Sequence, residues 1–254
     1  MAAVALSYRD ALVQSPTATQ MYLACPLRYQ QYLSGATQEV SPAMQTGRLM
    51  HQYLHHYLAT TDAARLNAAW EQLLAHHGRL AHRIVHIPYA VTTALQAATT
   101  HVELRLGAAR LDHVLQRQNG TYVIIDYKYV PHSIHTSNVS QLLHHNHQLL
   151  HYAWAFSQYS DIWFSQEDFT IDYGVCLISD DTCFIETVTA TKNRLQKWLE
   201  NSVEIWYTMQ RIRNNYNTAY RNEHSCYETV YGHERQCTYY RHCHGDIRQK
   251  VPEP

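Results

Sequence analysis

The sequence predicts an α/β protein in which a sheet-forming middle section follows a helical first part. Two observations lead to this class. Apolar residues recur at helical spacing through the first hundred residues, whereas strand-like runs joined by tight-turn signals begin near residue 101. With 254 residues, 46% of them hydrophobic, the chain is long enough to bury a substantial core. Only 7 Pro and 8 Gly exclude a disordered or collagen-like chain.

We expect one domain over residues 1–254, in three parts. A helical part covers 1–100, a core of sheet and helix covers 101–190, and a long helix with a cysteine-rich tail covers 191–254.

The first part contains three predicted helices. One begins at Ser15-Pro16-Thr17, and Pro26 must interrupt it because proline cannot continue a helix. A second begins at Ser41-Pro42, and a third covers 62–77. These helices could form a cap or flank one side of the sheet.

Three strands are predicted next, over 101–106, 111–116 and 121–130. Between the last two, Asn119-Gly120 supplies the positive φ that a tight hairpin turn needs. The continuous apolar run 123–125 is typical of a strand that is covered on both faces.

The remaining pattern alternates again between helix and strand. It predicts a helix over 137–159, strands over 172–178 and 183–188, and a long helix over 191–215. From Tyr216 onward the tail has little periodicity, so it needs something other than a hydrophobic core to hold it.

Composition excludes several functional classes. The chain contains no run of about 18 apolar residues that would suggest a membrane span. It also contains no phosphate-binding glycine motif that would suggest a nucleotide site. The first ten residues contain too short an apolar run for a secretory signal, so we expect a cytoplasmic protein with reduced cysteines. With 20 Lys+Arg against 21 Asp+Glu, any nucleic-acid surface must be local.

The hairpin strands carry the most informative polar residues. Asp126 and Lys128 lie two apart, so they share one face of their strand, and Asp112 lies on the neighbouring strand. Two carboxylates suit a hard divalent cation such as Mg²⁺ or Mn²⁺, and a lysine ammonium can position a water molecule or offset developing charge. An isolated D-x-K string is more often an exposed ion pair, so the surrounding motifs decide the interpretation.

Four strings occur together in the chain: G-x-x-x-H at Gly47–His51, the Asp112 of RLDHV, D-x-K at Asp126-Tyr127-Lys128, and Q-x-x-x-Y at Gln148–Tyr152. This combination resembles the PD-(D/E)XK nuclease superfamily, specifically its RecB-like branch, which includes CRISPR-associated nucleases and phage exonucleases. The resemblance covers roughly residues 17–244 and implies a restriction-endonuclease-like mixed sheet flanked by helices.

The resemblance also implies roles for individual residues. The metal ligands would be His51, Asp112, Asp126 and the main-chain carbonyl of Tyr127, with Lys128 as the catalytic lysine. Gln148 and Tyr152 lie one helical turn apart and would orient DNA or the active site. Glu103, on the preceding strand, is either a supporting acid or an ordinary surface residue. Of the 19 histidines only His51 has support beyond composition.

Four cysteines are candidates for a second metal centre, namely Cys25, Cys226, Cys237 and Cys243. Four thiolates suit Zn²⁺ or a [4Fe–4S] cluster, and spacing alone leaves both open. The nuclease resemblance implies the [4Fe–4S] cluster in a structural role, with Zn²⁺ as the less favoured occupant, since Cys25-Pro26 and the final C-x5-C follow that pattern. Cys226 departs from it by lying too far upstream. The other two cysteines, Cys176 and Cys183, read as buried strand residues.

The sequence thus predicts a metal-dependent DNA nuclease that acts as an exonuclease or on ends and single strands. Abundant Tyr and Trp could stack on unpaired bases. Scattered basic residues, such as Lys192 and Arg194, are candidates for phosphate contacts. A separate helicase, recombinase or integrase-type protein would be the partner. The alternative is a DNA-binding or assembly module with the same fold and little nuclease activity.

Overall fold

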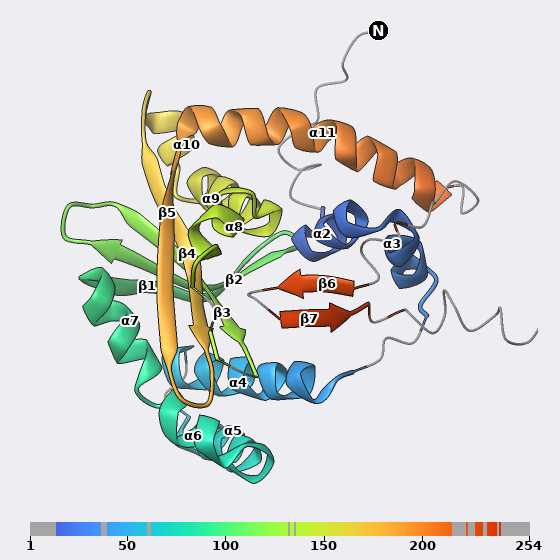
Figure 1. The fold of residues 1–254 in the computed structure, drawn as a ribbon. Coiled ribbons are helices and arrows are strands. Elements are labelled where there is room, and N and C mark those ends of the chain that lie inside the picture. The colour runs from blue at the N-terminus through green and yellow to red at the C-terminus, as the bar shows by residue number, and fades with distance from the viewer. Residues whose placement is uncertain are drawn as a thin grey trace, which may run out of the picture.

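A five-stranded mixed sheet lies between two layers of helices (Figure 1). The computed structural model describes residues 14–36, 40–59, 62–131, 133–134, 136–214, 222, 227–230, 233–237 and 239. In the sheet the strands follow their order in the chain: β1 (Ala97–Leu106), β2 (Ala109–Arg117), β3 (Tyr122–Tyr129), β4 (Thr170–Ile178) and β5 (Cys183–Thr191). The α/β class and the mixed, helix-flanked sheet are therefore as predicted.

The predicted hairpin turn joins β2 to β3. Gly120 has φ +86°, and the Asn119 side chain accepts a hydrogen bond from the Thr121 N–H at 3.0 Å. The two strands pair antiparallel as far as His113 and Ile125. The β1–β2 and β4–β5 pairs are also antiparallel, whereas β3 and β4 are parallel.

A parallel pair requires a crossover, and here two helices make it. They are α8 (Val139–His144) and α9 (His147–Tyr159). The prediction of one helix over 137–159 is therefore wrong at its centre. The Asn146 side chain accepts a hydrogen bond from the Leu149 N–H at 3.0 Å, so this residue caps a new helix.

One helical layer packs on the sheet face that carries Ile125 and Tyr127, and both are buried. The layer consists of α4 (Pro42–Ala59), α5 (Ala63–His76), α6 (Gly78–Ile84) and α7 (Ile87–Leu95). The Asp62 side chain caps α5 by accepting from two N–H groups, those of Ala64 and Arg65. The sequence did not predict α6 and α7, because seven to nine residues give too few turns for a clear apolar stripe.

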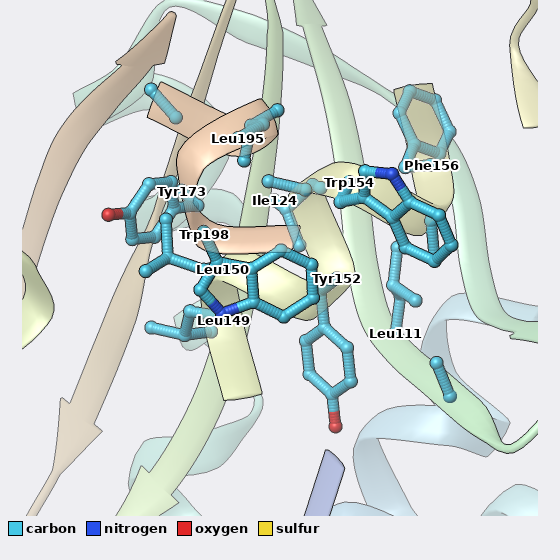
Figure 2. Packing of buried hydrophobic residues seen from close by; sticks show 14 of the residues in the cluster. Leu111, Ile124, Leu149, Leu150, Tyr152, Trp154, Phe156, Tyr173, Leu195 and Trp198 are labelled. Atoms are coloured by element: carbon cyan, nitrogen blue, oxygen red, sulfur yellow. The ribbon is translucent and has the colours of Figure 1, made fainter. Parts of the chain in front are cut away.

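The second layer covers the opposite face and contains the larger aromatic core. It consists of α2 (Pro16–Ala24), α3 (Pro26–Leu33), α9 and α11 (Lys192–Asn214), while the short α10 (Ile162–Ser165) precedes β4. Figure 2 shows Trp154 and Trp198 in this core, beside Leu111 and Ile124 of the sheet. The predicted N-terminal helices thus divide: the first lies on this face, and the next two lie on the other.

The tail contains a two-stranded hairpin that the sequence did not predict, formed by β6 (Tyr227–Val230) and β7 (His233–Gln236). Asn222 joins the tail to the start of the fold. Its main-chain N–H donates to Cys25 Sγ at 3.4 Å, and its side chain donates to the Ala24 carbonyl at 3.0 Å. In the part of the chain that the structure describes, no helix is both long and apolar enough to span a membrane.

Candidate active site

Three neighbouring strands each contribute one carboxylate at the same level of the sheet. The β1–β2 register places Glu103 opposite Asp112, because the residues on either side of these two are partners. Continuing the β2–β3 register by one position places Asp112 next to Asp126, immediately beyond the last paired residues. The site therefore lies where β2 and β3 stop pairing.

His51 of α4 completes a group that is able to hold a metal ion. Its Nδ1 lies 3.5 Å from Asp112 Oδ2. One ligand atom each from His51, Glu103 and Asp112 lies within 4.8 Å of the others. An imidazole and two carboxylates fit Mg²⁺ or Mn²⁺, which prefer oxygen ligands and tolerate imidazole. The predicted ligands His51 and Asp112 are thus together, and Glu103 joins them.

Asp126 lies beside this group but is bound to Lys128. Asp126 Oδ2 and Lys128 Nζ are 2.7 Å apart. Burial raises the pKa of Asp126, and Lys128 opposes that shift. For Lys128, burial alone would lower the pKa, but the carboxylates of Asp126 and Asp112 outweigh burial and raise it. Both carboxylates therefore favour the ammonium form of Lys128, which donates hydrogen bonds.

Tyr127 connects the acidic residues to the sheet face that α4 to α7 cover. Its main-chain N–H donates to Asp112 Oδ2 at 3.0 Å, which fixes that carboxylate. The side chain points to the opposite face, where its hydroxyl lies 2.8 Å from His113 Nδ1. His113 Nε2 in turn lies 2.8 Å from the hydroxyl of Thr99. We call Thr99, His113 and Tyr127 the support chain.

The support chain is uncharged. Burial lowers the pKa of His113 to about 4, although Asp112 opposes that shift. Burial also raises the pKa of Tyr127. A neutral imidazole has one N–H donor and one acceptor, so it can satisfy one hydroxyl on each side. Sequence reasoning missed His113 and Thr99, although strand alternation places His113 on the face opposite Asp112.

Glu103 has an unusual backbone for a strand residue, with φ +50°. Such a conformation costs about 1–3 kcal/mol in a residue other than glycine and is common at functional sites. Its Oε2 lies 2.9 Å from Arg110 Nε. Burial and then Asp112 raise the pKa of Glu103, whereas Arg110 lowers it. In the sequence, only its position on a predicted strand indicated that Glu103 could belong to the site.

The Q-x-x-x-Y pair of α9 faces the same carboxylates. Gln148 Nε2 donates to the Tyr152 hydroxyl at 2.7 Å. Burial raises the pKa of Tyr152, and the charge of Asp126 adds to that shift. Figure 2 shows the Tyr152 hydroxyl pointing away from the indole rings of Trp154 and Trp198. The predicted orienting residues therefore lie near the acidic group, with Tyr152 protonated.

Other predicted residues have structural partners or lie elsewhere. Lys192 Nζ donates to the Gln166 carbonyl at 2.7 Å. Arg194 donates to two main-chain carbonyls, one of them that of Thr189 at 3.0 Å. These three bonds tie the start of α11 to Gln166, to β5 and to the end of α8.

The cysteine prediction is only partly described by the structure. Cys25 is buried and Cys237 is half-buried, whereas Cys226 and Cys243 lie outside the described residues. Cys176 is fully buried on β4 as expected, and Cys183 at the start of β5 is only partly buried.

Comparison with known proteins agrees with this geometry. A solved structure of a protein described as "Putative exonuclease" from Eubacterium rectale aligns over 100% of this chain and 95% of its own, with a TM-score of 0.51 and 12% identity. At that identity the likeness shows the fold alone. No curated protein sequence matches the chain. The sequence model of the PD-(D/E)XK nuclease superfamily matches residues 14–244, and the chain therefore belongs to that superfamily.

Proposed function

We propose that this protein is a divalent-metal-dependent DNA nuclease of the RecB-like branch. The observation that carries the proposal is the row of carboxylates on three adjacent strands, with Lys128 Nζ 2.7 Å from Asp126 at its end. Asp112 and Asp126 are buried, and carboxylates are costly to bury side by side unless they bind an ion or do chemistry.

In this proposal His51, Glu103 and Asp112 hold the cation, and Asp126 and the Tyr127 carbonyl lie beside them as further ligands. A bound Mg²⁺ or Mn²⁺ would polarise the phosphoryl oxygen and lower the pKa of a coordinated water. Lys128 donates hydrogen bonds as an ammonium, so it orients the attacking water or offsets charge on the phosphoryl oxygens. Tyr152 and Gln148 bind and orient the DNA backbone from α9.

Cleavage assays test the proposal directly. Labelled linear and single-stranded DNA are incubated with Mn²⁺ and with wild type, Asp126→Ala or Lys128→Ala. We expect each substitution to lower the cleavage rate about 10²- to 10³-fold, the loss seen when one transition-state contact is removed. Equal activity in all three proteins would leave the DNA-binding or assembly module as the better interpretation.

The preferred substrate of the proposal is a DNA end or an unpaired strand, processed as an exonuclease. The near-neutral charge of the chain supports modest intrinsic affinity, so a separate helicase, recombinase or integrase-type protein would deliver the DNA. End-labelled duplexes and single strands of defined polarity distinguish these substrates, because cleavage of covalently closed circles at the same rate would contradict end-dependent action.

We also propose a structural [4Fe–4S] cluster at Cys25, Cys226, Cys237 and Cys243. The hydrogen bonds from Asn222 to Cys25 and Ala24 support the proximity of the tail to the Cys25-Pro26 string. Thiolate ligands within a poorly periodic tail are typical of a metal-stabilised segment. Anaerobically purified protein should be brown, with iron and sulfide in equal amounts. A colourless protein with stoichiometric zinc would contradict the cluster.

A further inference from the structure

Two arginines lie directly opposite each other on the β1–β2 hairpin. Arg105 and Arg110 are cross-strand partners, and both are exposed. Their neighbours Leu106, Ala109 and Leu111 are buried in the aromatic core, so the two guanidinium groups point away from it. Like charges directly opposite each other destabilise a hairpin, and an anionic ligand between them would offset that cost.

The arginine pair lies beside the acidic group. The cross-strand position two residues earlier in β1 is occupied by Glu103 and Asp112, at a separation of about 7 Å along the strands. Arg110 is held by Glu103, with Nε and Oε2 2.9 Å apart. Arg105 makes no hydrogen bond or ion pair with the residues that the structure describes, but its charge acts on Glu103.

We propose that Arg105 and Arg110 bind a phosphodiester group of the DNA strand that neighbours the linkage being cleaved. This inference rests on the proposed nuclease function and adds a substrate contact to it. Two planar guanidinium forks match the non-bridging oxygens of one phosphate, and the anion removes the repulsion between them. The distance to Asp112 and Glu103 is about that spanned by one extended nucleotide. Such a contact positions the strand without reading its bases.

Substitution of Arg105 distinguishes phosphate binding from simple neutralisation of the Glu103 charge. A single arginine would neutralise Glu103, and Arg110 already does so. Replacing Arg110 would leave a partly buried carboxylate unpaired, and this could disturb the metal group. Replacing Arg105 removes no hydrogen bond or ion pair among the described residues, and its charge is the smallest of those that act on Glu103, so its effect reports mainly on the ligand.

The first experiment measures DNA binding without cleavage. A fluorescein-labelled single-stranded oligonucleotide is titrated with full-length protein in EDTA between 50 and 200 mM salt. Arg105→Gln should weaken binding about 10-fold at the lowest salt and reduce the slope of log K against log[salt] by about 0.7. Arg79→Gln removes another exposed arginine, on α6, and should change neither quantity. An unchanged slope in Arg105→Gln would overturn the proposal.

The second experiment locates the phosphate. Oligonucleotides with one uncharged methylphosphonate at successive linkages are cleaved in Mn²⁺. In wild type, a methylphosphonate at one linkage next to the cleaved linkage should raise KM. In Arg105→Gln, a methylphosphonate at that same linkage should cause no further rise in KM. Arg105→Lys should recover part of the wild-type KM. If the effects of the methylphosphonate and of Arg105→Gln on log KM are additive, the proposed contact between Arg105 and this phosphate is contradicted.

The two proposals fail in different ways. Wild-type cleavage no greater than that of Asp126→Ala contradicts the nuclease function, yet the salt slope in EDTA still reports on Arg105. Normal cleavage with an unchanged KM and salt slope in Arg105→Gln contradicts only the phosphate contact.

Discussion

The two faces of β2 and β3 carry groups of different character. Asp112, Asp126 and Lys128 form a charged group at the point where β2 and β3 separate. One residue along each strand, His113 and Tyr127 form a neutral hydrogen-bonded pair in the core. The sheet can hold the repelling carboxylates together because uncharged hydrogen bonds fix its other face. Substitutions on one face at a time separate the charged group from its support.

Removing charge from the acidic face should have the largest effect on chemistry. Asp112→Asn keeps the shape of the side chain and its bond from the Tyr127 N–H but removes one of the two carboxylate charges in the group of His51, Glu103 and Asp112. We expect weaker Mn²⁺ binding in an electron paramagnetic resonance titration, and cleavage about 10²- to 10³-fold slower. Asp62→Asn, which retains the cap of α5, is the matched control. Unchanged Mn²⁺ affinity would contradict the assignment of Asp112.

Removing one hydroxyl from the support chain should affect stability more than chemistry. Tyr127→Phe leaves His113 Nδ1 buried without its partner. The free energy of unfolding should fall by about 1–3 kcal/mol, measured by urea titration of tryptophan fluorescence. Cleavage at saturating Mn²⁺ should fall less than it does in Asp112→Asn. Tyr89→Phe, at a 74% exposed position, should change neither quantity. A loss of activity without a loss of stability would assign the hydroxyl to the chemistry instead.

The aromatic core also contains a histidine that must remain neutral. His151 is fully buried, and both ring nitrogens lack a partner among the described residues. It lies against His147, Trp154, Trp198 and Trp206. Burial lowers its pKa to about 3, and the charge of His147 adds to that shift.

Between pH 6.5 and 3 the unfolded chain therefore binds more protons at His151 than the folded chain does. Stability should fall as the pH falls through this window, by up to about 1.4 kcal/mol per pH unit from this group. His151→Leu should be nearly neutral at pH 7.5 and should lose stability less steeply than wild type between pH 6.5 and 5. The exposed His145→Leu is the control. Parallel curves for wild type and His151→Leu would refute the neutral assignment.

The smallest effect is expected at the outer end of the support chain. Thr99→Val removes the hydroxyl next to His113 Nε2 but keeps a β-branched side chain in β1. Because Thr99 is exposed, water can replace the hydroxyl, and the free energy of unfolding should fall by about 0.5–1 kcal/mol. The double variant with Tyr127→Phe should depart from additivity if the chain acts as a unit. Strict additivity would show two independent bonds.

The sequence predicted the strands of the sheet and most of the candidate residues, because their signals are local. Asp126 and Lys128 follow a continuous apolar strand, and alternation alone places both on one face. The Asn119-Gly120 turn specified which strands pair. By contrast, the division between α8 and α9 depends on the Asn146 cap, which the uninterrupted helical pattern concealed.

Other features of the site depend on tertiary contacts that no local pattern contains. Glu103 joins the metal group through a cross-strand register and a positive φ, and neither can be read from a glutamate in an alternating strand. His113 was one of 19 histidines, and only the hydroxyls of Thr99 and Tyr127 distinguish it. Arg105 and Arg110 are informative only as partners across the hairpin.

The bonds between Asn222 and the Ala24–Cys25 corner also bear on how the molecule folds. They connect residues 197 and 198 positions apart, so the chain must be synthesised past Asn222 before they can form. Closing so long a loop is entropically costly until the intervening sheet and helices have brought the two segments together. The tail should therefore dock last, and native-state hydrogen exchange should find the Asn222 amide opening before the amides of β3.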